Sequence, residues 1–291
     1  MALKRILATT DFSQRSNRAL RRAASLSSAL SADLQLLHVV DDDQPIEVVE
    51  QEVRQAAALL EKAANELREV FGGAPVTSIK QGDPFQEIVQ AAVDAEVDLI
   101  AMGSHRKRLV RDVFVGTTIE RVMRTGRHPV LMVNTELSGP YRRIIVATDM
   151  SEASAHALRT AKSLGLLDGA HVSLLHAFEP FAKGMLIYAN VERENIEKYV
   201  DHEASETRRS MTEFLSNLDF TGLSYDVRLE EGGAFFTIKK IVDKERPDLL
   251  VIGTRGLTGV KRVLLGSVAD AVMRGVDCDI LAVPLAMSEE A

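Results

Sequence analysis

The sequence predicts an α/β protein made of two tandem doubly wound domains, each with a five-stranded parallel sheet. Two observations lead to this fold class. The second half of the chain repeats motifs of the first half, and within each half short apolar runs alternate with stretches of helical periodicity. Such alternation is typical of βαβ units, and nearly continuous apolar strands are typical of a parallel sheet covered on both faces.

The duplication is visible in four pairs of similar segments. The pairs are RILATTDF at 5–12 with RIIVATDM at 143–150, LLHVVDD at 36–42 with LLHAFEP at 174–180, DLIAMGSHR at 98–106 with DLLVIGTRG at 248–256, and RVMRTGRHPVLMV at 121–133 with AVMRGVDCDILAV at 271–283. A period of about half the chain indicates a duplicated domain and not a solenoid. The polar linker TELSGPY at 135–141 separates the copies, so we expect domains at 1–137 and 138–291.

The expected elements follow the same order in both halves. In the first half, strands are predicted at 4–9, 34–40, 76–80, 99–102 and 130–133, and helices at about 16–30, 46–71, 84–95 and 117–125. In the second half, strands are predicted near 143–147, 172–177, 225–229, 249–252 and 280–283. The second half is longer by 12 residues between His176 and Gly253, and we place them around 180–190. This apolar insertion is either an exposed interaction surface or a loop folded onto its own core.

Composition narrows the function classes. The chain has 291 residues, 46% of them hydrophobic, a formal charge of -7 and a pI of about 5.6. An acidic balance argues against a dedicated nucleic-acid-binding protein. No run approaches the ~20 apolar residues that span a bilayer, and the N-terminus does not resemble a signal peptide. The single cysteine, Cys278, fits a reducing compartment and is interpreted as a buried structural thiol, so we expect a cytoplasmic protein without a membrane contact.

Polar turns follow the first strand of each half. They read Thr10-Asp11-Phe12-Ser13 and Thr148-Asp149-Met150-Ser151. Ligands of doubly wound sheets bind outside the carboxyl ends of the strands. The Asp and Ser residues are therefore either helix caps or, for the carboxylates, acceptors for a ribose hydroxyl or an adenine amine.

The fourth strand of the second half carries a more specific signal. It ends in Ile252-Gly253-Thr254-Arg255-Gly256, and Gly266-Ser267 opens a helix nine residues later. Glycines allow close approach of the backbone to phosphate oxygens, and a helix N-terminus attracts negative charge. This pattern predicts phosphate binding. Dinucleotide and P-loop fingerprints are absent from the sequence, as are a metal-ligand cluster and a serine-hydrolase elbow, so no metal site is expected.

The spacing G-x2-G-x9-G-[ST] after a Thr-Asp turn resembles the ATP-binding signature of the universal stress protein family, over essentially the whole chain. The resemblance implies an adenine nucleotide α-hydrolase-like fold that binds ATP, or ADP or AMP, with or without Mg²⁺. By position it implies that Asp149 and the backbone near Ala147 and Ala177 contact the adenosine end. The residues implied at the ribose and phosphates are Ile252, Gly253, Gly256, Gly266, Ser267 and Val268.

The first half departs from this signature. Its corresponding residues are Asp11, Val39, Gly103, Arg106, Gly116 and Thr117, with Arg106 in place of the second glycine. The Arg106 side chain either blocks the phosphates or replaces the lost backbone donors. We expect one competent and one degenerate site. His38 and His176, which end the second strand of each half, are interpreted as hydrogen-bonded core residues and not as catalytic ones.

The leading hypothesis is a nucleotide-binding regulator of the stress response. The resemblance implies a homodimer, an unidentified protein partner, and halves that meet at the terminal strands 130–133 and 280–283. An alternative is an ATP-using enzyme; because no general base, arginine finger or Mg²⁺ cluster beyond Asp149 is evident, we expect hydrolysis to be slow at most. The other alternative is a partner-binding scaffold with a vestigial site.

Overall fold

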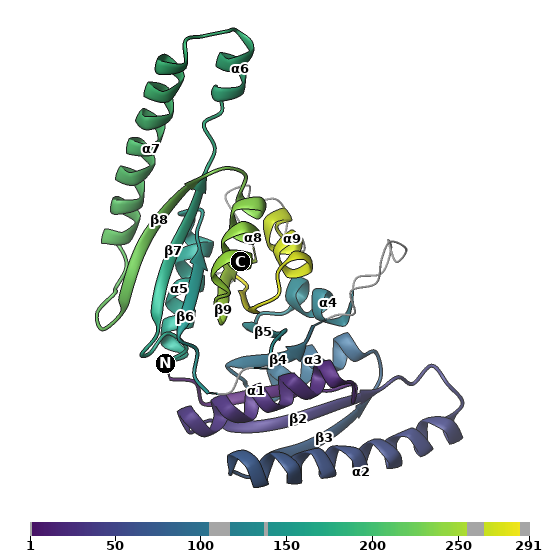
Figure 1. Ribbon diagram of the computed structural model, residues 1–291. Helices are drawn as coiled ribbons and strands as arrows, with labels where there is room; N and C mark the ends of the chain where they lie inside the picture. Colours follow the sequence, from purple (N-terminus) through teal and green to yellow (C-terminus); the bar gives the residue numbers. More distant parts are fainter. Residues whose placement is uncertain (1, 105–116, 137–138, 255–264, 286–291) are drawn as a thin grey trace, which may run out of the picture.

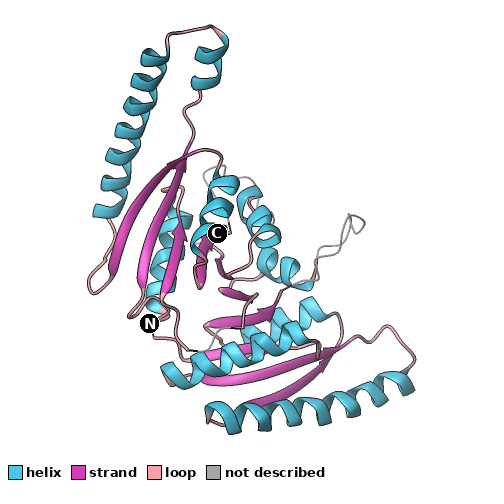
Figure 2. Cartoon of the chain, viewed as in Figure 1, coloured by secondary structure: helices cyan, strands magenta, loops and turns pink. Residues whose placement is uncertain are grey.

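A computed structural model describes residues 2–104, 117–136, 139–254 and 265–285. Within these residues, all ten strands join in one continuous sheet with the order β3-β2-β1-β4-β5-β10-β9-β6-β7-β8 (Figure 1). The predicted α/β class and the alternation of strands and helices are confirmed (Figure 2).

The two halves repeat one pattern of elements. The strands are β1 (Arg5–Thr9), β2 (Asp33–Val40), β3 (Val76–Gln81), β4 (Leu99–Gly103), β5 (Val130–Val133), β6 (Arg143–Ala147), β7 (His171–Phe178), β8 (Ser224–Glu231), β9 (Leu249–Gly253) and β10 (Asp279–Val283). The helices are α1 (Gln14–Leu30), α2 (Ile46–Phe71), α3 (Pro84–Asp94), α4 (Thr118–Thr125), α5 (Glu152–Ser163), α6 (Lys183–Tyr188), α7 (Arg193–Ser216), α8 (Ala234–Glu245) and α9 (Ser267–Gly275).

The halves meet at their terminal strands, as expected. β5 and β10 pair antiparallel, with Leu131 opposite Leu281 and both side chains fully buried. All other strand pairs are parallel. The two parallel blocks therefore run in opposite directions, and the carboxyl ends of their strands lie at opposite edges of the sheet. Any ligand sites at these ends are separate sites on the molecule.

One hydrophobic cluster covers each face of the sheet and crosses from one half to the other. On one face, Leu20 of α1 and Leu158 of α5 belong to the same cluster. On the other face, the cluster includes Val122 of α4 and Val272 of α9. A parallel sheet requires such cover on both faces, and its continuity joins the halves into one packed unit.

The insertion of the second half forms α6, which Figure 1 shows beside the far end of α7. None of the α6 residues is buried. Phe181, Met185 and Tyr188 are 89%, 71% and 91% exposed. The interpretation of this segment as a loop folded onto its own core is therefore wrong. In the described part of the chain, no helix is long and apolar enough to cross a membrane.

Candidate functional site

The turn after β6 is held by its own polar side chains. The Thr148 hydroxyl accepts a hydrogen bond from the Met150 N–H at 2.9 Å and contacts the Ser154 hydroxyl at 2.9 Å. Met150 has a φ of 61°, a left-handed conformation that is uncommon for a non-glycine residue. Ser151 caps α5 by accepting from the Ser154 N–H, which confirms the capping interpretation of this serine. The same turn recurs after β1, where Phe12 has a φ of 60° and Ser13 caps α1.

These contacts hold Asp149 at the carboxyl end of β6. Its Oδ1 accepts hydrogen bonds from both the N–H and the hydroxyl of Ser151. The carboxylate is thus oriented by the cap of α5 while it lines a cavity of about 270 Å³. In this half the aspartate takes part in the turn and also borders the cavity.

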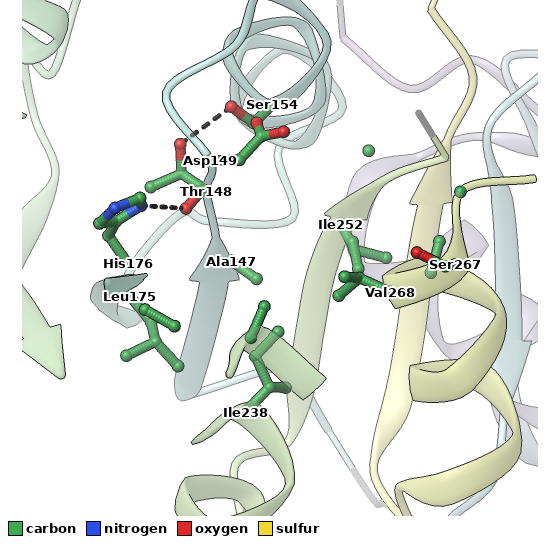
Figure 3. Close-up of a pocket in the computed structure, with 15 residues that line it drawn as sticks. Ala147, Thr148, Asp149, Ser154, Leu175, His176, Ile238, Ile252, Ser267 and Val268 are labelled. Atoms are coloured by element: carbon green, nitrogen blue, oxygen red, sulfur yellow. Dashed lines mark hydrogen bonds between the residues drawn. The ribbon is translucent and has the colours of Figure 1, made fainter. Parts of the chain in front are cut away.

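The cavity lies between the ends of β6, β7 and β9 and the helices α8 and α9 (Figure 3). In Figure 3 Thr148 and Asp149 border one side, Ile252, Ser267 and Val268 lie across from them, and Ile238 of α8 lies below. An apolar cleft with a few oriented polar groups is the usual form of a small-molecule site.

Eight of the nine residues predicted for the second-half site line this one cavity. They are Ala147, Asp149, Ala177, Ile252, Gly253, Gly266, Ser267 and Val268. The ninth, Gly256, lies outside the described residues. The residues implied by the family resemblance, some of which are more than 100 positions apart in the chain, therefore lie around one cavity.

The first turn of α9 has no side-chain cap within the described residues. Gly266 is the N-cap, and the Asp270 N–H makes a helical bond to the Gly266 carbonyl at 2.9 Å. The Gly266 N–H donates to the Thr254 carbonyl at 2.8 Å, and the N–H groups of Ser267, Val268 and Ala269 have no intrahelical acceptor, as at any helix start. These three N–H groups lie at the cavity, because Ser267, Val268 and Ala269 line it. This arrangement can bind an anion through the free N–H groups and the helix dipole.

The first half has a matching cavity of about 310 Å³. Four residues of the predicted degenerate site line it, namely Asp11, Val39, Gly103 and Thr117. The two others, Arg106 and Gly116, lie outside the described residues. Burial raises the pKa of Asp11, but hydrogen bonds from Ser13 and Ser16 outweigh this effect and hold the pKa below its ordinary value.

The first turn of α4 is closed, unlike that of α9. The Thr117 hydroxyl accepts from the Glu120 N–H, and the Glu120 carboxylate accepts from the Thr117 N–H at 3.1 Å, which completes a capping box. A phosphate at this helix start would compete with a carboxylate that already occupies it. The other carboxylate oxygen of Glu120 lies 2.7 Å from Arg274, in the last turn of α9.

Gly103 also has a packing role. A Cβ added there would lie 2.7 Å from the backbone of Arg15 and Ser16 at the start of α1. The glycine at the end of β4 is therefore required by helix packing, whether or not a ligand approaches it.

Both halves of the chain match a known protein family. The family model for the universal stress protein family matches residues 2–134 and 140–284. The chain belongs to the universal stress protein family.

Three relatives illustrate the match. Universal stress protein MJ0577 of Methanocaldococcus jannaschii is 30% identical over 158 residues, covering 46% of this chain and 97% of the relative. The crystal structure of a universal stress protein from Archaeoglobus fulgidus superimposes with a TM-score of 0.71 at 20% identity, covering 96% of this chain and 98% of that one. A universal stress protein solved in complex with cAMP matches 46% of this chain and 99% of its own, with a TM-score of 0.41 and 21% identity.

The other candidate residues of this universal stress protein are the two histidines at the ends of β2 and β7 and the single cysteine. The Nδ1 atoms of His38 and His176 lie 2.8 Å from the carbonyl oxygens of Thr10 and Thr148, so both histidines are hydrogen-bonded as expected. They are only partly buried and line the two cavities, so placing them in the core was wrong. Cys278 is buried, and burial raises the pKa of its thiol to about 12. No group of three metal-ligating side chains occurs among the residues that the structure describes.

Two features of this universal stress protein were missed in the sequence. The capping box reads Thr117-Thr118-Ile119-Glu120, an S/T-x-x-E pattern that marks a closed helix start and could have been found. The contribution of Ile238 to the cavity had no such signal. It comes from a helix that packs across the sheet, and the strand-end rule says nothing about the covering helices.

Proposed function

We propose that the second half of this universal stress protein binds ATP, or a related adenine nucleotide, and that occupancy regulates its part in the stress response. The observation that carries the proposal is the uncapped N-terminus of α9 at one end of an apolar cavity. The phosphates would lie against the α9 N–H groups and Gly256. The base would lie against Ala147, Ala177 and Ile238, within reach of Asp149.

The asymmetry between the halves supports one nucleotide per chain. In the first half the Thr117–Glu120 box satisfies two N–H groups of the helix start, and the sequence has Arg106 where the second half has Gly256. We propose that domain 1–137 is the degenerate copy and domain 138–291 the competent one. Regulation would follow if two conformations of the surface differ in their affinity for the nucleotide.

We also propose that the protein acts in the cytoplasm as a homodimer with a further protein partner. The single buried cysteine is compatible with a reducing compartment. Any hydrolysis of ATP would be slow, and turnover at about 1 per second or more would favour the alternative of an ATP-using enzyme.

The test is isothermal titration of the full chain with ATP and Mg²⁺, beside Gly256→Arg, which copies the first half. The matched control is Arg106→Gly, which changes the same position of the other half. We expect one site per chain in the wild type and its loss in Gly256→Arg. Two sites in the wild type would show that the first half also binds. Absence of binding would overturn the proposal and favour the scaffold with a vestigial site.

A further inference from the structure

A third cavity, of about 340 Å³, lies away from both strand-end cavities and shares no lining residue with them. It is formed by the middle of α1, the end of α2 and the segment that joins the halves. Its lining residues are Arg18, Arg21, Arg22, Val70, Phe71, Thr135, Glu136 and Gly139. We call it the arginine cavity, because one face of α1 contributes three guanidinium groups.

These positive charges are only partly balanced by the chain. Arg22 pairs with Asp279 at 3.4 Å, and Arg18 pairs with Glu136 at 3.4 Å. The Arg21 guanidinium lies 5.6 Å from the ring centre of Phe71 and makes no ion pair with any described residue. Three cations against two carboxylates leave one positive charge in excess. The Glu136 side chain is 80% exposed, so it can turn away and leave an excess of two.

The guanidinium donors of Arg22 are buried and incompletely satisfied by the described residues. The Arg22 side chain is 1% exposed, and its Nη1 donates to the Gly139 carbonyl at 2.8 Å. Among the described residues its Nη2 has no acceptor, whereas its Nε and the Nε of Arg18 have only the 3.4 Å ion pairs with Asp279 and Glu136. A buried polar group without a partner is costly, especially on a charged side chain. A native protein keeps such groups mainly where an ion, a water molecule or a ligand completes them.

The cluster is not a general requirement of the fold. The positions of the second half that correspond to Arg18, Arg21 and Arg22 are His156, Arg159 and Thr160. The equivalent helix of the second half, α5, therefore has one arginine at these three positions. The two additional arginines are particular to the helix that faces the joining segment.

We propose that the arginine cavity binds a phosphate group, either free orthophosphate or the phosphate of a small phosphomonoester. A phosphate dianion matches the excess of two positive charges that remains when Glu136 turns away, whereas a carboxylate would neutralise only one. The guanidinium group suits phosphate, because its planar fork donates two parallel hydrogen bonds to adjacent oxygens. The bound phosphate would connect α1 to the segment between the halves. This site does not depend on the nucleotide site proposed above.

The test compares thermal unfolding and isothermal titration of the full chain in sodium phosphate and in sodium chloride at equal ionic strength. The variant Arg21→Gln removes an exposed guanidinium that makes no ion pair with a described residue, so the fold should persist. Its matched control is Arg159→Gln, the corresponding residue of the second half. Removing one charged hydrogen-bond donor should weaken phosphate binding by about tenfold or more, while Arg159→Gln should bind as the wild type does.

A second variant tests the competition with the chain's own carboxylate. Glu136→Gln should bind phosphate more tightly than the wild type. Glycerol 3-phosphate serves as the ester: tighter binding of the ester assigns the site to a phosphomonoester, and tighter binding of orthophosphate assigns it to the free ion. Equal stability in phosphate and chloride, or unchanged affinity in Arg21→Gln, would overturn the proposal. Gly256→Arg should leave phosphate binding intact, which separates this site from the nucleotide site.

Discussion

The Asp279 carboxylate is buried at the junction of the halves and accepts several hydrogen bonds there. Its Oδ1 accepts hydrogen bonds from the Asn134 N–H, the Thr135 N–H and the Thr135 hydroxyl, at 2.9, 3.0 and 2.9 Å. Its Oδ2 accepts from the Tyr141 hydroxyl at 3.0 Å and lies 3.4 Å from Arg22. The side chains of Asp279 and Arg22 are 0% and 1% exposed. The carboxylate therefore fixes the start of the joining segment and neutralises a buried cation at the same time.

The substitution Asp279→Asn tests this role. An asparagine keeps a carbonyl oxygen for the N–H groups of Asn134 and Thr135, but it leaves the Arg22 charge without a counter-ion. Removing one partner of a buried ion pair costs about 3–5 kcal/mol. The free energy of unfolding should fall by this amount in urea denaturation followed by circular dichroism, and the melting temperature by roughly 10 °C.

The double variant Arg22→Met with Asp279→Asn separates charge pairing from lost hydrogen bonds. Because the buried cation is removed together with its partner, this variant should be more stable than Asp279→Asn alone. The control is Glu197→Gln, which breaks an ion pair with Arg193. The Glu197 side chain is 59% exposed and the Arg193 side chain is 91% exposed. That change should cost less than about 0.5 kcal/mol. A loss below about 1 kcal/mol in Asp279→Asn, or additive losses in the double variant, would refute the reasoning.

Three further outcomes are expected. At pH 8 an aromatic disulfide reagent should modify Cys278 only after denaturation, because burial raises the pKa of its thiol from 9.0 to about 12. Rapid modification of the native protein would contradict this expectation. The same pKa shift should lower the free energy of unfolding as the pH rises from 9 towards 12, because the unfolded thiol loses its proton first. The pair Ser267→Thr and Asp270→Glu copies the capping box onto α9 and should weaken ATP binding by about tenfold in titration calorimetry, at ~1.4 kcal/mol; unchanged affinity would remove α9 from the site. Tyr188→Ser should change the free energy of unfolding by less than about 0.5 kcal/mol, since this side chain is 91% exposed, and a loss above about 1 kcal/mol would show that α6 supports the core.

The sequence was sufficient for the order of the elements because each element satisfies a local rule. The apolar run at 130–133 coincides with β5, and the predicted helix at 46–71 coincides with α2 (Ile46–Phe71). The contact between β5 and β10 was expected only from the family resemblance, and the antiparallel direction of their pairing was not predicted. Hydropathy marks both strands as buried but does not indicate whether they pair parallel or antiparallel, since that depends on how the two packed halves meet.

The candidate site was predictable at the strand ends and at the Gly266-Ser267 start of α9, and not where it depends on a helix that covers the sheet. Asp149 and Gly253 follow directly from the ends of β6 and β9. Ile238 could not be found in this way, because its place in the cavity is set by the packing of α8 against the sheet. The helix starts were treated as equivalent in the sequence, yet the N-cap falls on Thr117 in one half and on Gly266, one position earlier in the repeat, in the other.

The two helix starts differ in the position of the N-cap and in the length of one acidic side chain. Glu120 and Asp270 occupy corresponding positions of the repeat. The longer Glu120 reaches back to the Thr117 N–H and closes the start of α4. The shorter Asp270 is instead held by Arg274, one turn along α9, at 3.2 Å, and the start of α9 stays uncapped. Arg274 also contacts Glu120, so a single guanidinium supports the closed start of one helix and holds the acidic side chain of the other away from its N-terminus. Two copies of one fold can thus carry one capped and one uncapped helix start without any change in the sheet.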